Sequence, residues 1–155
     1  MERLWAPWRV KYVSNPDKEK ECIFCQKSQE KNDKKNLIVS RGKYCFALLN
    51  IYPYNNGHIM IAPYNHAGDI VQLEEYELSE MFRLVKELEI KIKSILNPDG
   101  FNIGINIGKS AGAGMENHLH MHLVPRWGGD TNFMAVVSDT RVISQSLEEL
   151  YELLT

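Results

Sequence analysis

The sequence predicts an α+β protein with a mostly antiparallel sheet of about five strands, one long helix and a short C-terminal helix. Three observations favour this class. Residues 73–96 have apolar side chains at helical spacing, short apolar runs separated by turn residues occupy much of the remainder, and "HLHMHLV" alternates with a period of two. Neither a repeat nor a linker interrupts the chain. We therefore expect a single domain over residues 1–155, with residues 1–21 as an N-terminal arm and residues 22–155 as the core.

The composition is that of an ordinary globular protein, with 44% apolar and 25% charged residues. A formal net charge of -2 argues against nucleic-acid binding, which usually requires a basic excess. The N-terminus lacks an apolar core of signal-peptide length, and no run of about 18 apolar residues could span a bilayer. We therefore expect a cytoplasmic protein that does not associate with membranes.

The first part of the chain is expected to contain an arm, a loop and three strands. Trp5, Trp8 and Tyr12 are large side chains that need a surface, either on this domain or on a second subunit. The polar run over residues 26–36 is expected to be a solvated loop. Strands are expected at 37–40, 43–49 and 57–62, separated by Gly42 and by the turn-rich "YPYNNG".

The second part begins with the long helix, from Leu73 to Leu96, whose apolar residues recur in steps of three and four. "NPDG" ends this helix, because proline cannot continue it and glycine accepts the left-handed turn. A strand at 101–107, the glycine-rich segment 108–114, the histidine strand and a short helix from about Ser146 to Leu154 follow.

Two of the three cysteines have the spacing of a metal half-site. Cys22 and Cys25 form "CIFC", and zinc prefers four ligands, commonly completed by histidine. His66 and one member of the histidine row are the candidates for the remaining positions. Unliganded loop thiols are the alternative, and a redox pair is less favoured because no helix is predicted to begin after the second cysteine. Cys45 lies in an apolar stretch and is expected in the core.

The segment "NHLHMHLVPRW" places three histidines at every second position. In a strand, His118, His120 and His122 lie on one side while the intervening apolar residues face the core. Such a row suits a metal site, a nucleophile or base, or an anion-binding surface. Any one of these histidines alone could be structural, but three in register are not readily explained in that way.

The glycine-rich segment runs directly into the histidine row. Its small residues allow backbone amides to approach an anion closely, and Lys109 and Ser110 add a charge and a hydroxyl. A flexible hairpin loop is the alternative. Because the segment adjoins three histidines, a phosphate-binding loop is favoured.

The row "HLHMHLV" resembles the signature of the histidine triad (HIT) family of nucleotide hydrolases and transferases. "LLNIYPYNNGHIMIAPYNH" at 48–66 resembles the nucleoside-binding half of that family. "LWAPWR" near the start, "PRWGGDTNFM" at 125–134 and the C-terminal "DTRVISQSLEELYELL" are similar to a bacterial branch that includes dinucleoside polyphosphate phosphorylases. The resemblance covers nearly the whole chain and implies a HIT-like fold.

The resemblance also implies roles for individual residues. His120 matches the family's nucleophile, which accepts a nucleoside monophosphate, while His122 and His58 match histidines that contact phosphoryl oxygens. Asn50 matches the ribose contact. The phosphate-side contacts match Asn106, Lys109, Ser110, Gly112, Ala113 and Gly114. In zinc-bearing members a structural zinc is bound at the positions of Cys22, Cys25, His66 and His118.

The activity implied is cleavage at the α-phosphorus of dinucleoside polyphosphates of the diadenosine tetraphosphate type, with water or phosphate as acceptor. Magnesium would enter only with such a substrate. The alternatives are an adenosine phosphoramidate hydrolase and a zinc-stabilised nucleotide-binding module without turnover. Met115 replaces a serine of the phosphoramidate-cleaving branch, which favours the polyphosphate substrate. Family members commonly pair through the long helix and a sheet edge, so a homodimer or higher homo-oligomer is expected.

Overall fold

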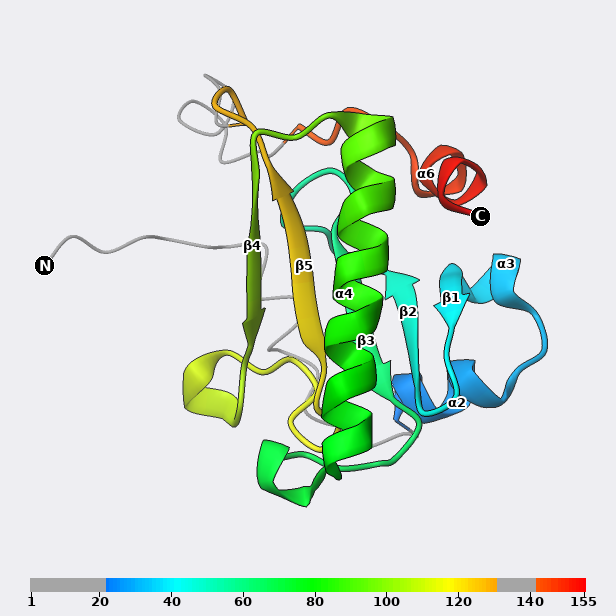
Figure 1. The fold of residues 1–155 in the computed structure, drawn as a ribbon, viewed down its shortest axis with the longest axis vertical. Coiled ribbons are helices and arrows are strands. Elements are labelled where there is room, and N and C mark those ends of the chain that lie inside the picture. Colours follow the sequence, from blue (N-terminus) through cyan, green and yellow to red (C-terminus); the bar gives the residue numbers. More distant parts are fainter. Residues whose placement is uncertain (1–21, 131–141) are drawn as a thin grey trace, which may run out of the picture.

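The computed structural model describes residues 22–130 and 142–155 (Figure 1). The predicted N-terminal arm, with Trp5, Trp8 and Tyr12, and residues 131–134 of the segment "PRWGGDTNFM" lie outside the described residues.

Five antiparallel strands form one sheet, which confirms the predicted fold class. The strands are β1 (Ile38–Arg41), β2 (Cys45–Leu49), β3 (Ile59–Pro63), β4 (Gly100–Ile105) and β5 (Met121–Arg126). Their order across the sheet is β1-β2-β3-β5-β4, so β5 lies between β3 and β4. In the β3–β5 register Met60 is opposite His122, which brings the beginning of β3 next to the histidine segment.

Helix α4 (Glu75–Leu96) covers one face of the sheet and contacts β2, β3 and β5 (Figure 1). It begins two residues later than predicted, where Glu74 and Glu77 form a capping box. The left-handed residue at its end is Asn97, with φ 45°, and Gly100 instead begins β4. Asparagine tolerates this conformation, which explains why glycine is not needed there.

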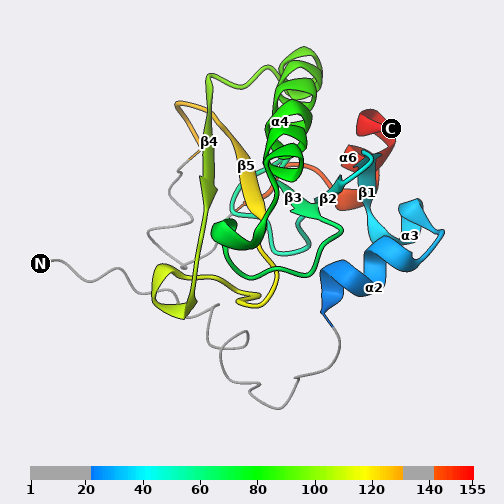
Figure 2. The same cartoon turned by 60° about the horizontal axis from the view of Figure 1, so that its bottom comes forward.

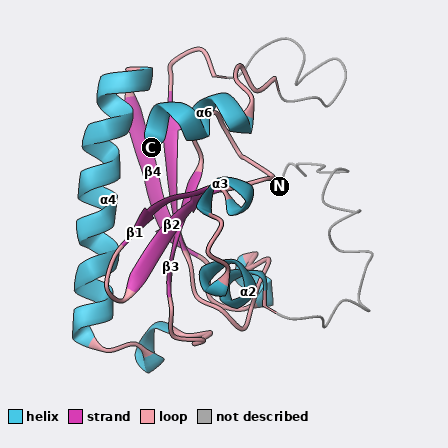
Figure 3. Ribbon diagram, turned by 90° about the vertical axis from the view of Figure 1, so that its right-hand side faces the viewer, coloured by secondary structure: helices cyan, strands magenta, loops and turns pink. Residues whose placement is uncertain are grey.

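The predicted loop at 26–36 is wrong, because this stretch is largely helical. Helix α2 (Ile23–Gln29) is followed by the single turn α3 (Asp33–Asn36). Phe24 of α2 is buried in a second apolar cluster, and Figure 3 shows the sheet between α2 and α4. Seven residues are too few for a clear periodic pattern, so the polar residues at the end of α2 dominated the prediction.

The C-terminal helix α6 (Leu147–Leu154) agrees with the prediction. Ser146 accepts a hydrogen bond from the Glu149 amide, and the two residues form a capping box. Leu150 and Leu154 belong to the core cluster beneath α4. None of the helices in residues 22–130 and 142–155 has the length and apolarity that crossing a membrane requires.

The histidine segment is less regular than predicted. β5 begins at Met121, so only His122 lies in a strand, and His118 and His120 precede it. Leu119 donates its amide to the Ala67 carbonyl in the loop after β3, at 2.6 Å, which replaces a regular strand pairing. The alternation nevertheless holds, since Leu119, Met121 and Leu123 enter the main core.

Candidate functional site

Four of the five histidines are buried at one place on the sheet: His58, His118, His120 and His122. His122 lies in β5 and His58 immediately precedes β3, its partner strand. The fifth, His66, lies in the loop after β3 and contacts His118. Antiparallel pairing of β3 and β5 thus gathers every histidine of the chain at one site.

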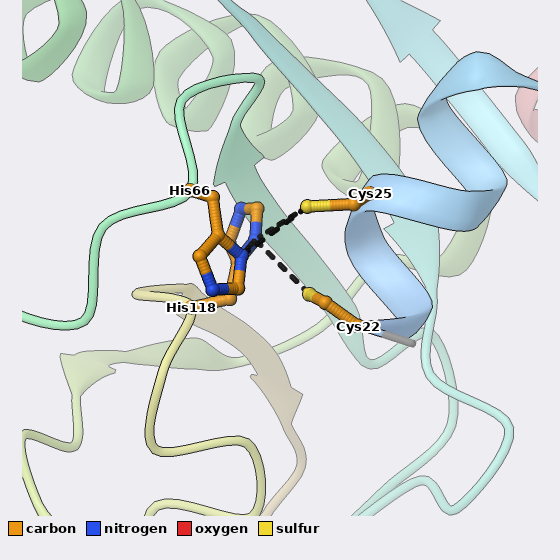
Figure 4. Close-up of side chains that lie close together, drawn as sticks. All are labelled: Cys22, Cys25, His66 and His118. Atoms are coloured by element: carbon orange, nitrogen blue, oxygen red, sulfur yellow. Dashed lines mark hydrogen bonds between the residues drawn. The ribbon is translucent and has the colours of Figure 1, made fainter. Parts of the chain in front are cut away.

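The predicted metal ligands come together as a group of four (Figure 4). Their ligand atoms, the sulfurs of Cys22 and Cys25 and the Nδ1 atoms of His66 and His118, lie within 4.8 Å of one another. Cys22 Sγ is 3.2 Å from His118 Nδ1, and the two Nδ1 atoms are 3.3 Å apart. Ligand atoms around tetrahedral zinc are separated by about 3.3–3.8 Å, as follows from zinc–nitrogen and zinc–sulfur bond lengths. The donor set and spacing therefore fit zinc.

The protonation of His118 suits this role. Its Nε2–H donates to the Pro63 carbonyl at 2.9 Å, so the lone pair is on Nδ1 and faces the thiols. Burial lowers the pKa of His118, which keeps the ring neutral. Burial, together with the neighbouring Cys22, raises the pKa of the Cys25 thiol to about 11. A divalent cation favours the thiolates and would counter this shift.

Contrary to the predicted loop, a helix begins between the two cysteines, at Ile23. Cys22 is the N-cap of α2 and Cys25 lies in its first turn. The same turn aims both sulfurs at the two histidines: Cys25 Sγ is 3.3 Å from His66 Nδ1. This geometry favours metal binding on grounds that the sequence did not provide.

His120 has one nitrogen fixed and one free to react. Its Nδ1–H donates to the His118 carbonyl at 2.9 Å, which places the lone pair on Nε2. Burial lowers the pKa of His120, so the ring is neutral near pH 7. A neutral imidazole with this tautomer can act as a nucleophile or as a general base.

His58 and His122 form a hydrogen-bonded pair whose tautomers are also fixed. The Tyr54 amide donates to His58 Nδ1 at 3.0 Å, so the His58 proton is on Nε2. That proton is donated to His122 Nδ1 at 2.8 Å, which leaves His122 with a proton on Nε2. Burial and the neighbouring histidines lower the pKa of His58 to about 3 and that of His122 to about 4. Both rings are therefore neutral hydrogen-bond donors.

Tyr54 is a contributor that the sequence reasoning missed. Besides its amide, its ring lies over His58 and His122, with centroid distances of 4.6 and 5.5 Å. The motif "YPYNNG" predicted only a turn, and no side-chain pattern reveals an amide that fixes a tautomer.

Of the predicted substrate-binding residues, Asn50 contacts a histidine directly. Asn50 is buried; its side-chain nitrogen donates to His58 Nδ1 at 3.3 Å and its oxygen accepts the Tyr52 amide. The glycine-rich segment contains a 3-10 turn, Lys109–Ala111, and Figures 1 and 2 place it at the same end of the sheet as α2.

Within this segment several amides are already engaged. The amides of Ala111, Gly112 and Ala113 donate to carbonyls of the segment itself. Asn106 donates to the Gly112 carbonyl at 3.4 Å, and the side chains of Lys109 and Ser110 are exposed. The phosphate-binding role of this segment, including Gly114, stays a prediction.

Comparison with known proteins identifies the family. A model of the HIT domain matches residues 31–129. The "AP-4-A phosphorylase" of Mycobacterium tuberculosis (strain CDC 1551 / Oshkosh) is 38% identical over 161 residues, which cover 99% of this chain and 83% of the relative. The asymmetrical bis(5'-nucleosyl)-tetraphosphatase of Schizosaccharomyces pombe is 30% identical over 60% of this chain and 50% of the relative.

A solved structure agrees in fold. The Zn-bound histidine triad family protein from Mycobacterium smegmatis superposes with a TM-score of 0.69 at 28% identity, over 86% of this chain and 90% of that chain. The two relatives described above are named as enzymes, which confirms the prediction of an enzyme of this family. The domain match, the relatives and the fold show that the chain belongs to the histidine triad (HIT) family.

Proposed function

We propose that the chain cleaves dinucleoside polyphosphates of the diadenosine tetraphosphate type at the α-phosphorus, through a nucleotide bound covalently to His120. The observation that carries this proposal is the tautomer of His120, whose Nδ1–H is held by the His118 carbonyl while Nε2 keeps its lone pair. The names of the mycobacterial and yeast relatives support the substrate class.

The first step forms one bond and breaks one. His120 Nε2 attacks the α-phosphorus, the bond from phosphorus to the bridging oxygen breaks, and ATP leaves as an anion. Positive charge develops on the ring, and the hydrogen bond from Nδ1–H to the His118 carbonyl stabilises it. In the second step an oxygen of the acceptor attacks phosphorus, the phosphorus–nitrogen bond breaks, and neutral His120 is restored.

His122 and His58 are placed to stabilise the phosphoryl group. The chain of donors from the Tyr54 amide through His58 fixes a proton on His122 Nε2, which can donate to a phosphoryl oxygen. Because the site is buried, such a donor acts more strongly than it would in water. Asn50 and the glycine-rich segment are proposed to bind the ribose and the remaining phosphates.

Zinc is proposed as a structural ion at Cys22, Cys25, His66 and His118. When bound, it would hold the thiolates and the two imidazoles in a closed four-ligand site. In this role the four ligands fix α2 to the histidine segment. His120 attacks the reacting phosphate, and His122 and His58 stabilise it. Magnesium is proposed only as a companion of the polyphosphate substrate.

Met115 favours a polyphosphate over a phosphoramidate. Its side chain packs against the second apolar cluster, as do those of Cys22 and Tyr64. An amine leaving group needs a proton, whereas ATP leaves as an anion. A thioether cannot donate a proton, so Met115 hinders cleavage of a phosphoramidate more than cleavage of a polyphosphate. An adenosine phosphoramidate should therefore be a poor substrate.

Phosphate is the proposed acceptor of the second step, because the relative that is 38% identical over nearly the whole chain is named a phosphorylase. Diadenosine tetraphosphate, incubated with and without inorganic phosphate, tests this. ADP plus ATP formed only with phosphate agrees with the proposal, and AMP plus ATP in phosphate-free buffer identifies a hydrolase instead. Binding without turnover by the parent would contradict an enzymatic role altogether.

A further inference from the structure

Helix α2 carries an aromatic residue between its two cysteines. Cys22 and Cys25 direct their sulfurs toward His118 and His66, as Figure 4 shows. Phe24 is 1% exposed and belongs to the second apolar cluster. One short helix therefore reaches both the metal-ligand group and the apolar cluster.

The Phe24 ring lies against the histidine that we propose as nucleophile. Its centroid is 4.8 Å from that of His120, with an interplanar angle of 33°, and 5.1 Å from that of His118. Phe46, which is fully buried, contacts Phe24 edge-on at 6.5 Å. The apolar cluster thus supports Phe24, and Phe24 covers one face of the His120 ring.

His120 needs this second constraint. A single hydrogen bond, from Nδ1 to the His118 carbonyl, fixes the direction of one ring atom but lets the ring tilt about that bond. Attack on phosphorus requires the opposite nitrogen to be aligned with the breaking bond, and a misplacement of about 1 Å can cost roughly 100-fold in rate. A rigid aromatic surface against the imidazole limits the tilt.

We infer that Phe24 is a positioning residue, through which α2, held at Cys22 and Cys25, fixes the orientation of the His120 ring. The expected effect of Phe24 on catalysis rests on the proposed function, in which His120 is the nucleophile. α2 has seven residues, which is too short for stability in isolation, so its position depends on packing and on the ligand atoms of the cysteines. Occupancy of the metal-ligand group is therefore coupled to the order of His120.

The kinetic test compares two single substitutions in the same apolar cluster. Phe24→Leu should lower kcat by on the order of 10-fold to 100-fold with KM nearly unchanged, because binding is kept while the ring of His120 loses its alignment. Phe46→Leu removes the same ring volume from a residue whose ring contacts are with Phe24 and Tyr64, so it should lower kcat much less than Phe24→Leu does. A Phe24→Leu protein with raised KM and parental kcat would overturn the inference and identify Phe24 as a wall of the substrate pocket.

A second readout needs no turnover. Long-range proton–nitrogen NMR of the histidine side chains should show the Nδ1–H tautomer of His120 alone in the zinc-loaded parent and in Phe46→Leu. Zinc-loaded Phe24→Leu and the metal-free parent should both keep this tautomer but show broadened or shifted His120 ring signals, because the ring tilts about its remaining hydrogen bond. An unchanged His120 spectrum in these two samples would overturn the inference. If the parent does not turn over the substrate, the proposed function fails, while this spectrum still decides the role of Phe24.

Discussion

The histidines of this site have the same side chain, yet each has a different hydrogen-bonding role. The Pro63 carbonyl holds the Nε2 proton of His118, the His118 carbonyl holds the Nδ1 proton of His120, and the Tyr54 amide excludes a proton from His58 Nδ1. A backbone N–H can only donate and a backbone carbonyl can only accept, whereas each nitrogen of a neutral imidazole can do either. The backbone partner therefore decides which ring nitrogen carries the proton. In the proposed function, a metal ligand, a nucleophile and a hydrogen-bond donor thereby arise from one residue type.

The buried neutral pair His58 and His122 predicts how stability depends on pH. Their pKa values of about 3 and about 4 in the folded protein compare with about 6.5 in an unfolded chain. Below about pH 6.5 the unfolded chain binds protons that the folded protein does not. The free energy of unfolding should therefore fall between about pH 6.5 and pH 4, by about 1.4 kcal/mol per pH unit for each histidine.

Urea unfolding at a series of pH values measures this slope. His122→Asn should lose the share of the slope that belongs to one histidine, since asparagine does not titrate in this range. Equal slopes in the parent and the variant would show that the pair is not neutral in the folded protein.

At the scale of elements, strong periodicity made the long helix and the strands predictable. Residues 73–96 gave a clear apolar face, and the observed α4 differs from the prediction by two residues. α2 was missed because its position depends on tertiary contacts of Phe24 and on Cys22 and Cys25, which a local pattern does not contain. Cys22, Cys25 and His66 were candidate ligands from their residue types and spacing, and the resemblance selected His118 from the histidine row. The distances and tautomers of these residues follow only from the packing of α2 on the histidine segment.

Removal of metal should therefore destabilise the protein. An ion that binds only the folded state stabilises it by about 4 kcal/mol when free ion exceeds its Kd by about 1,000-fold. Thermal unfolding with zinc and with a chelator measures the difference, which Cys25→Ser should abolish. Cys45→Ala is the matched control, because Cys45 is buried in the main core outside the ligand group and its variant should keep the zinc effect. A chelator without effect on the parent would contradict the proposed site.

At the scale of the whole molecule, the strand order explains how the site is assembled. β5 pairs with β3, so a segment near residue 120 meets the loop before Ile59, and apolar clusters cover both faces of the sheet. Both the α+β class and the strand segments could be predicted from the sequence. The pairing of β3 with β5, about 60 residues apart, could not be predicted, because no local sequence pattern specifies the partner of a strand.

The outer surface leads to a prediction about assembly. β4 pairs only with β5 among the strands of the described residues. Ile103 on β4 is 47% exposed, and Phe82 and Ile90 on α4 are 60% and 62% exposed. We propose that a second copy covers this surface in a homodimer. Light scattering should give twice the mass of the chain, and Ile103→Lys should shift the protein toward monomer. A monomeric parent at micromolar concentration would exclude the dimer.

The proposed covalent step at His120 is tested most directly by mass spectrometry of a rapidly quenched reaction. The parent, mixed with diadenosine tetraphosphate in phosphate-free buffer and kept at alkaline pH, should carry one adenylyl group on the peptide that contains His120. His120→Ala should bind the substrate, carry no adduct and lose turnover by on the order of 1,000-fold or more. Rapid product formation by His120→Ala, with no adduct on the parent, would contradict the mechanism.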